Sequence, residues 1–142
     1  MKSRNNLDIE LKEFIDNIST YLTLALKLLE IDSILFTKGE INRMHDICER
    51  FFLKNMTFGF TENQFELIFT AYAGEAFIHY HPGVWSISTL KRDPAYGKFI
   101  IIDWAPPGRV WVRACPYEWL VGIKNKTFGR KLSDVITWQF NL

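Results

Sequence analysis

The chain has 142 residues, of which 48% are apolar and 15% aromatic, and its formal net charge is +1. A chain of this length and composition can bury one hydrophobic core, so we expect a single domain over residues 1–142. No uninterrupted apolar run approaches the roughly 20 residues of a membrane-spanning helix. The first residues lack the apolar segment of a signal peptide. These features predict a cytoplasmic protein without a membrane partner.

Charge is unevenly distributed along the chain. Residues 1–83 contain 12 acidic and 8 basic side chains, whereas residues 84–142 contain 4 acidic and 9 basic ones. Such a dipole suits a partner that is guided electrostatically, although random surface variation also produces it. Cys48 and Cys115 show neither CxxC spacing nor the density of a disulfide framework, so we expect two buried free thiols.

The N-terminal part is predicted to be helical. Apolar residues at steps of three and four predict one long helix over residues 7–31, with residues 17–20 as a weak point where polar side chains compete for backbone groups. Thr37 and Glu40 form a capping-box pattern that opens a second helix ending near residue 53.

A third, amphipathic helix is predicted from the capping box of Thr61 and Gln64 to Tyr80, because its apolar residues also recur at steps of three and four. The loop before this helix contains three large apolar residues that we expect to hold it to the core: Met56, Phe58 and Phe60.

A turn and a strand follow this helix. Pro82 biases His81 away from helical angles, and Gly83 can adopt a positive φ. The pattern then alternates over residues 84–90 with Trp85 on the apolar side, which predicts a half-buried strand.

The remaining segments complete a small sheet. Residues 98–104 (KFIIIDW) are a β-branched run typical of a central strand buried on both faces. Residues 109–115 (RVWVRAC) alternate between an apolar and a polar-aromatic face, which predicts a third strand of an antiparallel meander. Pro116 opens a short helix to Lys124, while residues 133–140 fit either a last helix or a fourth strand.

The predicted fold class is therefore α+β. Helices over residues 1–80 would pack on a small antiparallel sheet of three to four strands, and a short C-terminal helix would complete residues 81–142.

The junction between the third helix and the first strand holds candidate functional residues. Gly74 costs about 1 kcal/mol relative to alanine within a helix, so we expect Trp85 to pack closely against it. Glu75 beside this contact needs a donor and would form an anchoring hydrogen bond between helix and sheet. The alternative is a general base that acts with His79 or His81 in a small enzyme or ligand-binding domain.

A metal site and a cofactor are not predicted. Glu75, His79, His81 and Asp103 carry ligand-type side chains, but their spacing does not match the HExxH pattern. The glycines are scattered singly, so no phosphate-binding loop is predicted, and no GxSxG nucleophile motif is present. The sequence therefore assigns no catalytic residue.

An aromatic-basic surface is the stronger signal for function. Arg109, Trp111 and Arg113 share the polar face of their predicted strand, and Trp and Arg are the residues most enriched at binding hot spots. We therefore predict that these three residues contact a protein partner. Trp and Arg also stack on bases, so a nucleic-acid partner stays open. Three further segments would border this surface: Trp104, Trp119 and residues 124–131. The alternative is that the C-terminal helix simply covers the tryptophans.

Three short motifs add a resemblance. Tyr72-Ala73-Gly74-Glu75 on a helix, Gly83-Val84-Trp85 at a strand start and the Pro-led segment from Pro116 to Lys126 resemble small bacterial α+β domains that are largely uncharacterised. Some of these domains are thought to be immunity proteins of toxin systems, and the resemblance covers about residues 61–133. It implies a binding protein without catalysis, and hence a stoichiometric immunity protein that neutralises a bacterial toxin by occlusion.

Overall fold

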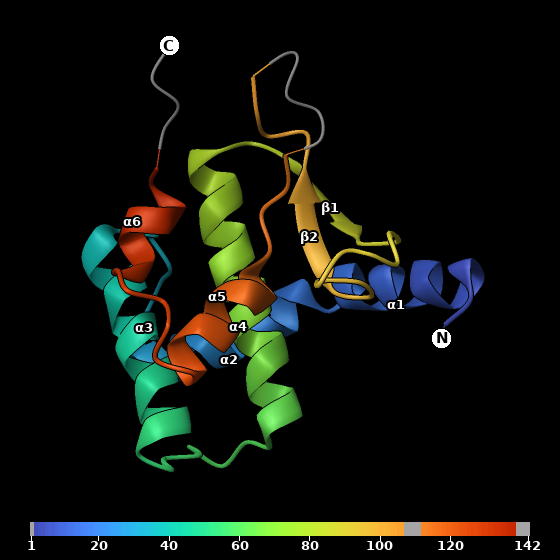
Figure 1. The fold of residues 1–142 in the computed structure, drawn as a ribbon. Helices are drawn as coiled ribbons and strands as arrows, with labels where there is room; N and C mark the ends of the chain where they lie inside the picture. The colour runs from blue at the N-terminus through green and yellow to red at the C-terminus, as the bar shows by residue number, and fades with distance from the viewer. Residues whose placement is uncertain (1, 107–111, 139–142) are drawn as a thin grey trace.

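The computed structural model describes residues 2–106 and 112–138, and it has helices packed on a small antiparallel sheet (Figure 1). The α+β class and the short C-terminal helix are therefore confirmed. The elements, in chain order, are α1 (Arg4–Asp16), α2 (Ile18–Leu29), α3 (Lys38–Leu53), α4 (Glu62–Tyr80), β1 (Val84–Ile87), β2 (Phe99–Ile102), α5 (Pro116–Lys124) and α6 (Leu132–Ile136).

The predicted long first helix is wrong, because the structure divides it at Asn17. This residue has φ −107° and ψ 5°, and its side-chain Nδ2 donates to the Glu13 carbonyl oxygen over 2.8 Å. The side chain thus competes for a helical carbonyl, as residues of this type do. The break lets α1 pack on β1 while α2 packs on α4.

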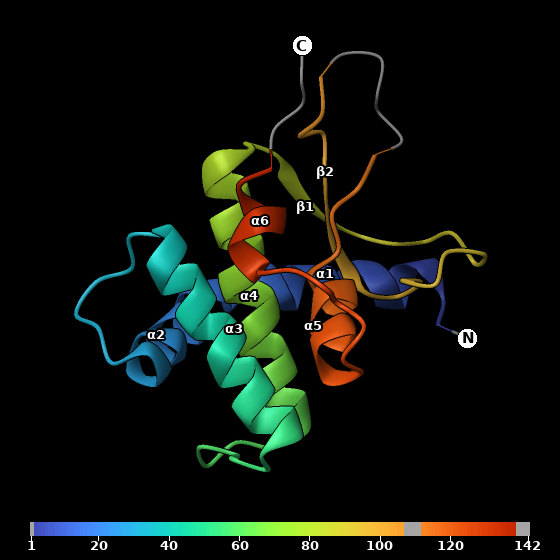
Figure 2. The same ribbon diagram turned by 60° about the vertical axis from the view of Figure 1, so that its left-hand side comes forward.

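Helix α4 is the central element of the molecule. Figure 2 shows it in the middle, with α2 and α3 on one side and the sheet on the other. The predicted capping box at its start is confirmed, since Thr61 and Gln64 exchange backbone–side-chain hydrogen bonds of 2.8 and 3.1 Å. The predicted amphipathic character is wrong, because every residue from Ile68 to Gly74 is buried. Neighbours on several sides leave α4 without a solvent face there.

Only half of the predicted capping box forms at α3. The Thr37 hydroxyl accepts from the Glu40 backbone N–H at 3.1 Å. The Glu40 carboxylate instead accepts from the N–H groups of Leu35 and Phe36, and from the Tyr72 hydroxyl at 2.8 Å. Burial and this carboxylate raise the pKa of Tyr72. Glu40 therefore ties the connector before α3 to the centre of α4.

The sheet pairs β1 and β2 in antiparallel register, with Trp85 opposite Ile101 and Ile87 opposite Phe99. Trp85 and Ile87 are buried, which confirms the apolar side predicted for β1. Ile100 and Ile101 point to opposite faces of β2 and are both buried, as predicted for a central strand.

The predicted third strand lies partly outside the described residues, which omit Arg109 and Trp111. Within the described part, Ala114 and Ile101 exchange backbone hydrogen bonds of 2.8 and 3.0 Å as an isolated bridge. The described residues thus form two strands and one bridge, and the expected three to four strands are not found among them.

Gly83 is required for a different reason from the one predicted. Its φ is not positive, but a Cβ atom there would lie 2.7 Å from the Ile102 carbonyl oxygen and 2.9 Å from Ile101 Cγ2. A side chain at this position would therefore collide with β2, so the glycine permits close approach of the turn to the sheet.

The C-terminal part matches the predicted elements. Helix α5 has the predicted bounds, and α6 selects the helix of the two alternatives up to Ile136. Both cysteines are buried free thiols, as expected. The loop before α4 differs from the prediction, because Phe60 packs on the core whereas Met56 and Phe58 are 45% and 38% exposed. No helix in the described part of the chain is long and apolar enough to cross a membrane.

Candidate functional site

The junction of α4 and β1 is a structural anchor. A Cβ atom on Gly74 would lie 2.0 Å from Trp85 Cη2, which confirms the predicted close packing. The Trp85 indole Nε1 donates to Glu75 Oε2 over 2.8 Å, so the expected bond between helix and sheet is present. Phe14 of α1 packs edge-on against the same indole at 4.9 Å between ring centroids. Glu75 is thus used to fix the strand on the central helix.

The two histidines near Glu75 have other partners. His81 is 8% exposed, and its Nε2 lies 3.0 Å from the Ile136 carbonyl oxygen of α6. His79 is exposed, with its ring 5.5 Å from that of Phe36. Among residues 2–106 and 112–138, no group of three or more His, Cys, Asp or Glu side chains could hold a metal ion.

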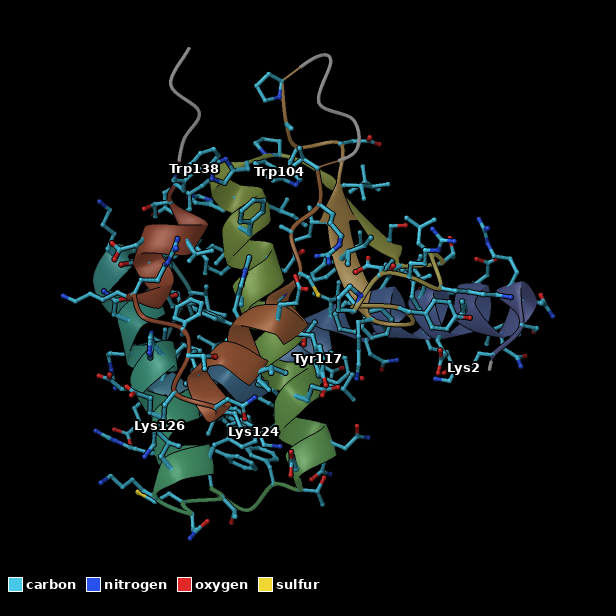
Figure 3. All side chains as sticks on the ribbon, viewed as in Figure 1. Lys2, Trp104, Tyr117, Lys124, Lys126 and Trp138 are labelled. Carbon is cyan, nitrogen blue, oxygen red and sulfur yellow. The ribbon has the colours of Figure 1, made fainter. Side chains whose placement is uncertain are left out.

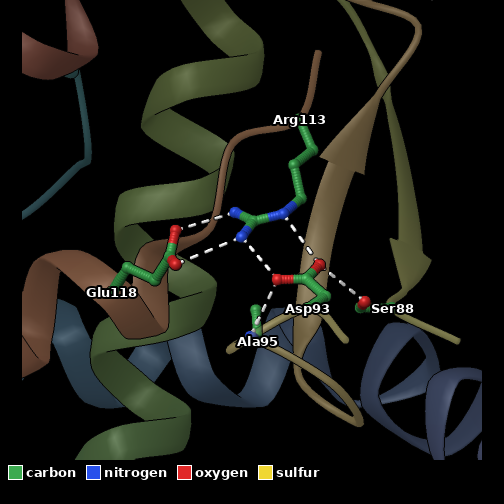
Figure 4. A network of polar contacts seen from close by, with 5 residues as sticks. All are labelled: Ser88, Asp93, Ala95, Arg113 and Glu118. Carbon is green, nitrogen blue, oxygen red and sulfur yellow. Dashed lines mark hydrogen bonds and ion pairs between the residues drawn. The ribbon is translucent and has the colours of Figure 1, made fainter. Parts of the chain in front are cut away.

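Arg113 forms the most extensive polar network (Figure 4). Its Nε and Nη2 donate to the two carboxylate oxygens of Asp93 at 2.9 and 2.7 Å, and its Nη1 and Nη2 donate to Glu118 at 2.7 and 3.1 Å. Asp93 also accepts from the Ser88 hydroxyl and from the Ala95 backbone N–H. The network joins the loop after β1, the segment beside β2 and the first turn of α5.

The pKa values reflect this pairing. Burial alone would raise the pKa of Asp93, but its hydrogen bonds from Arg113, Ala95 and Ser88 outweigh burial and hold the pKa below its ordinary value. The hydrogen bond to Glu118, followed by the bonds to Asp93, raises the pKa of Arg113 against the opposing effect of burial. The predicted contact residue Arg113 is therefore already engaged by two carboxylates of its own chain.

An aromatic hollow of about 290 Å³ lies between the sheet, α4 and the C-terminal helices. We call it the tryptophan groove. Figure 3 shows Trp104 and Trp138 at the same end of the molecule. The lining of the tryptophan groove includes three tryptophans, further apolar residues and three charged ones: Trp104, Trp119, Trp138, Phe77, Val112, Val135, Arg113, Glu118 and Arg130.

The groove combines apolar surface with one available cation. Trp138 is 48% exposed, and Trp104 and Trp119 are half-buried. Arg113 and Glu118 bind each other across 2.7 Å. Arg130 is exposed and, within the described residues, has no ion pair. The groove therefore offers aromatic contact area beside a positive charge whose partner is not supplied by this part of the chain.

Sequence patterns found only part of this groove. Trp104, Trp119 and the basic turn were expected to border the binding surface, and Trp104, Trp119 and Arg130 of that turn do line one hollow. Arg109 and Trp111 lie outside the described residues. Trp138 was missed because helix and strand were both open for residues 133–140, which left the direction of its side chain undefined.

Comparisons with family models, curated proteins and solved structures found no match to this chain.

Proposed function

We propose that the chain is a stoichiometric protein-binding module, an immunity protein that occludes a bacterial toxin, and that the tryptophan groove is its contact surface. The supporting observation is that three of the five tryptophans of the chain line one hollow together with Arg130, an arginine that has no ion pair among the described residues. Tryptophan supplies large contact area with few rotatable bonds, and it is enriched with arginine at binding hot spots.

The charge of the groove favours an acidic protein segment as the occupant. Arg113 is neutralised by Asp93 and Glu118, so Arg130 is the cation left for a partner among the described lining residues. A segment with an apolar or aromatic side chain next to a carboxylate would fill the hollow and pair with Arg130. Nucleic-acid binding relies on neutralising several phosphates. The described lining has one arginine without an ion pair and one acidic residue, which suits that task less well.

Occlusion needs tight binding in a fixed ratio. The test is isothermal titration with the toxin domain encoded next to this protein, using the intact chain, the variant Trp138→Ala and the control Leu90→Ala. Leu90 is 70% exposed and is not among the groove residues. We expect one-to-one binding, a loss of about 2 kcal/mol or more for Trp138→Ala, as at hot spots, and no change for Leu90→Ala. Equal affinity for all three proteins would exclude the groove as the contact surface, and a ratio that does not saturate would exclude stoichiometric occlusion.

A further inference from the structure

Helix α6 forms one wall of the tryptophan groove and depends on α3 for its N-terminal hydrogen bonds. The Leu132 backbone N–H donates to His45 Nδ1 over 3.0 Å, and the Ser133 backbone N–H donates to Asn42 Oδ1 over 3.1 Å. Both acceptors are side chains of α3. The first turn of α6 is thus attached to the helix beneath it by one amide and one imidazole.

The imidazole of His45 can accept this bond only in one form. Nδ1 must carry a lone pair, so the ring proton lies on Nε2, which is 3.7 Å from Glu49 Oε1. Protonation would place a hydrogen on Nδ1, facing the N–H of Leu132. It would also place a positive charge at the N-terminal end of α6, where the helix dipole is positive. The imidazolium is therefore incompatible with the observed contact.

The surroundings of His45 contain charges of both signs. Glu49 on α3 favours a cation, whereas Lys126 and Arg130 of the loop between α5 and α6 line the same hollow and oppose one. Asp134 lies in the first turn of α6, where it accepts from the backbone N–H of Lys131. The Phe128 ring packs edge-on at 5.6 Å and shields the imidazole, whose side chain is 14% exposed.

The other end of α6 is also bound to a histidine. His81 Nε2 lies 3.0 Å from the Ile136 carbonyl oxygen, so Nε2 carries the proton in this contact too. The ring is buried between Phe77 and Trp104, and this burial lowers the pKa of His81 against the effect of the Ile136 carbonyl. A second proton, on Nδ1, would bring charge into an aromatic environment but would leave the Nε2–H donor to Ile136 in place.

From these contacts we infer that α6 is a proton-sensitive wall of the groove, docked while His45 Nδ1 accepts from the Leu132 N–H and released when this nitrogen takes up a proton. Release would carry Val135 and Trp138 away from the groove. The consequence for partner binding rests on the proposed function, whereas the release itself does not.

Amide hydrogen exchange of the intact protein tests the release without a partner. Exchange at Leu132 and Ser133, corrected for the intrinsic pH dependence, should rise by about tenfold or more between pH 7.5 and pH 5. Buried amides of α4, such as those of Phe69 and Ala73, serve as the internal reference and should keep their protection. Unchanged relative protection of Leu132 and Ser133 across this range would overturn the inference, and so would equal loss of protection in α4.

Two variants assign the effect to the histidine. His45→Asn keeps an acceptor oxygen near the position of Nδ1 but cannot be protonated, so Leu132 should stay protected at pH 5. His79→Asn changes an exposed histidine that does not contact α6, and it should behave like the parent. If His45→Asn lost protection in acid as the parent does, His45 would not be the sensor. These readouts involve no partner, so their failure would leave the proposed binding function intact.

Discussion

Gly74 and Trp85 show how one missing side chain positions a strand on a helix. The indole occupies the space that a Cβ atom would need, since the distance would be 2.0 Å, and its N–H is then directed to Glu75. Alanine gains about 1 kcal/mol over glycine in a helix, but overpacking of a filled core costs about 1 to 3 kcal/mol. At 2.0 Å from a ring atom the clash outweighs the gain.

Because the contact would be as short as 2.0 Å, we take the upper part of the overpacking range, about 2 to 3 kcal/mol. Subtracting the helix gain of about 1 kcal/mol, we predict that Gly74→Ala lowers the free energy of unfolding by about 1 to 2 kcal/mol. The matched control is Gly39→Ala in the first turn of α3, where an added Cβ would meet nothing within 4 Å. This control should be neutral or stabilising, because only the helix propensity changes. Chemical denaturation of both variants measures the difference, and equal stability of Gly74→Ala and the parent would disprove the packing account.

His81 predicts a dependence of stability on pH. Its pKa in the folded protein lies below the ordinary 6.5, mainly because of burial. Between these two pKa values the unfolded chain binds more protons than the folded one, so the free energy of unfolding falls as the pH decreases below about 6.5. His81→Gln retains an N–H donor for the Ile136 carbonyl and cannot titrate in this range, so it should reduce the slope of stability against pH.

The comparison for this prediction is His79→Gln. His79 is exposed, and its substitution should leave the slope as in the parent. Denaturation curves at several values between pH 7.5 and pH 5 supply the slopes. If His81→Gln and His79→Gln gave the same slope as the parent, burial of neutral His81 would not contribute to stability.

Arg113 acts at the scale of elements, because its guanidinium connects a loop, a strand edge and a helix. Removing it leaves the Asp93 carboxylate, whose side chain is 9% exposed, with only the Ser88 and Ala95 donors. A buried carboxylate that loses its charged hydrogen-bond donor costs about 1 to 3 kcal/mol, and we expect Arg113→Ala to lower the free energy of unfolding by that amount. Arg113→Lys keeps the charge but not the planar fork, so its loss should be smaller.

Arg92→Ala is the control for the Arg113 network. Arg92 is exposed in the same loop, and surface substitutions usually change stability by less than about 0.5 kcal/mol. Thermal or denaturant unfolding distinguishes the variants. A loss below about 0.5 kcal/mol for Arg113→Ala would show that the network does not hold the elements together. A loss of about 1 kcal/mol or more would also make Arg113 a poor residue for testing partner contact, since its removal would then change the fold.

Local patterns predicted most helix and strand positions but not the spatial relations that other elements impose. Thr61, Gln64 and Pro116 act within a few residues, and their elements were predicted correctly. The burial of α4 from Ile68 to Gly74 on all sides depends on neighbours distant in sequence, whereas the local periodicity indicates a single buried face. Glu40 likewise bonds Tyr72, 32 residues away, instead of completing a local capping box.

The candidate site shows the same division between local and distant information. Close packing at Gly74 was predictable because a glycine within a helix is costly and a tryptophan follows a tight turn. The pairing of Arg113 with Asp93 was not, because the two residues are 20 positions apart and lie in different segments. The alternating pattern of residues 109–115 places Arg113 on the polar face of its segment. It contains no information on whether the Arg113 side chain contacts a partner or its own chain.

At the scale of the whole molecule, the basic C-terminal half contains α6 and every lining residue of the groove except Phe77. Residues 84–142 have 9 basic and 4 acidic side chains, and three of the acidic ones are engaged by this half itself through Arg113 and the Lys131 backbone. This excess should steer an acidic partner toward the groove, while the tryptophans supply the contact area that retains it. Charge and aromatic surface thus affect different steps of binding.

The most direct test of the groove is therefore the measurement of association and dissociation rates with the cognate toxin domain at several salt concentrations. We predict that Arg130→Ala slows association and weakens its salt dependence, whereas Trp138→Ala mainly speeds dissociation. Leu90→Ala should match the parent in both rates. If Arg130→Ala and Trp138→Ala both retained the parent's rates at every salt concentration, the tryptophan groove would not be the surface that binds the toxin.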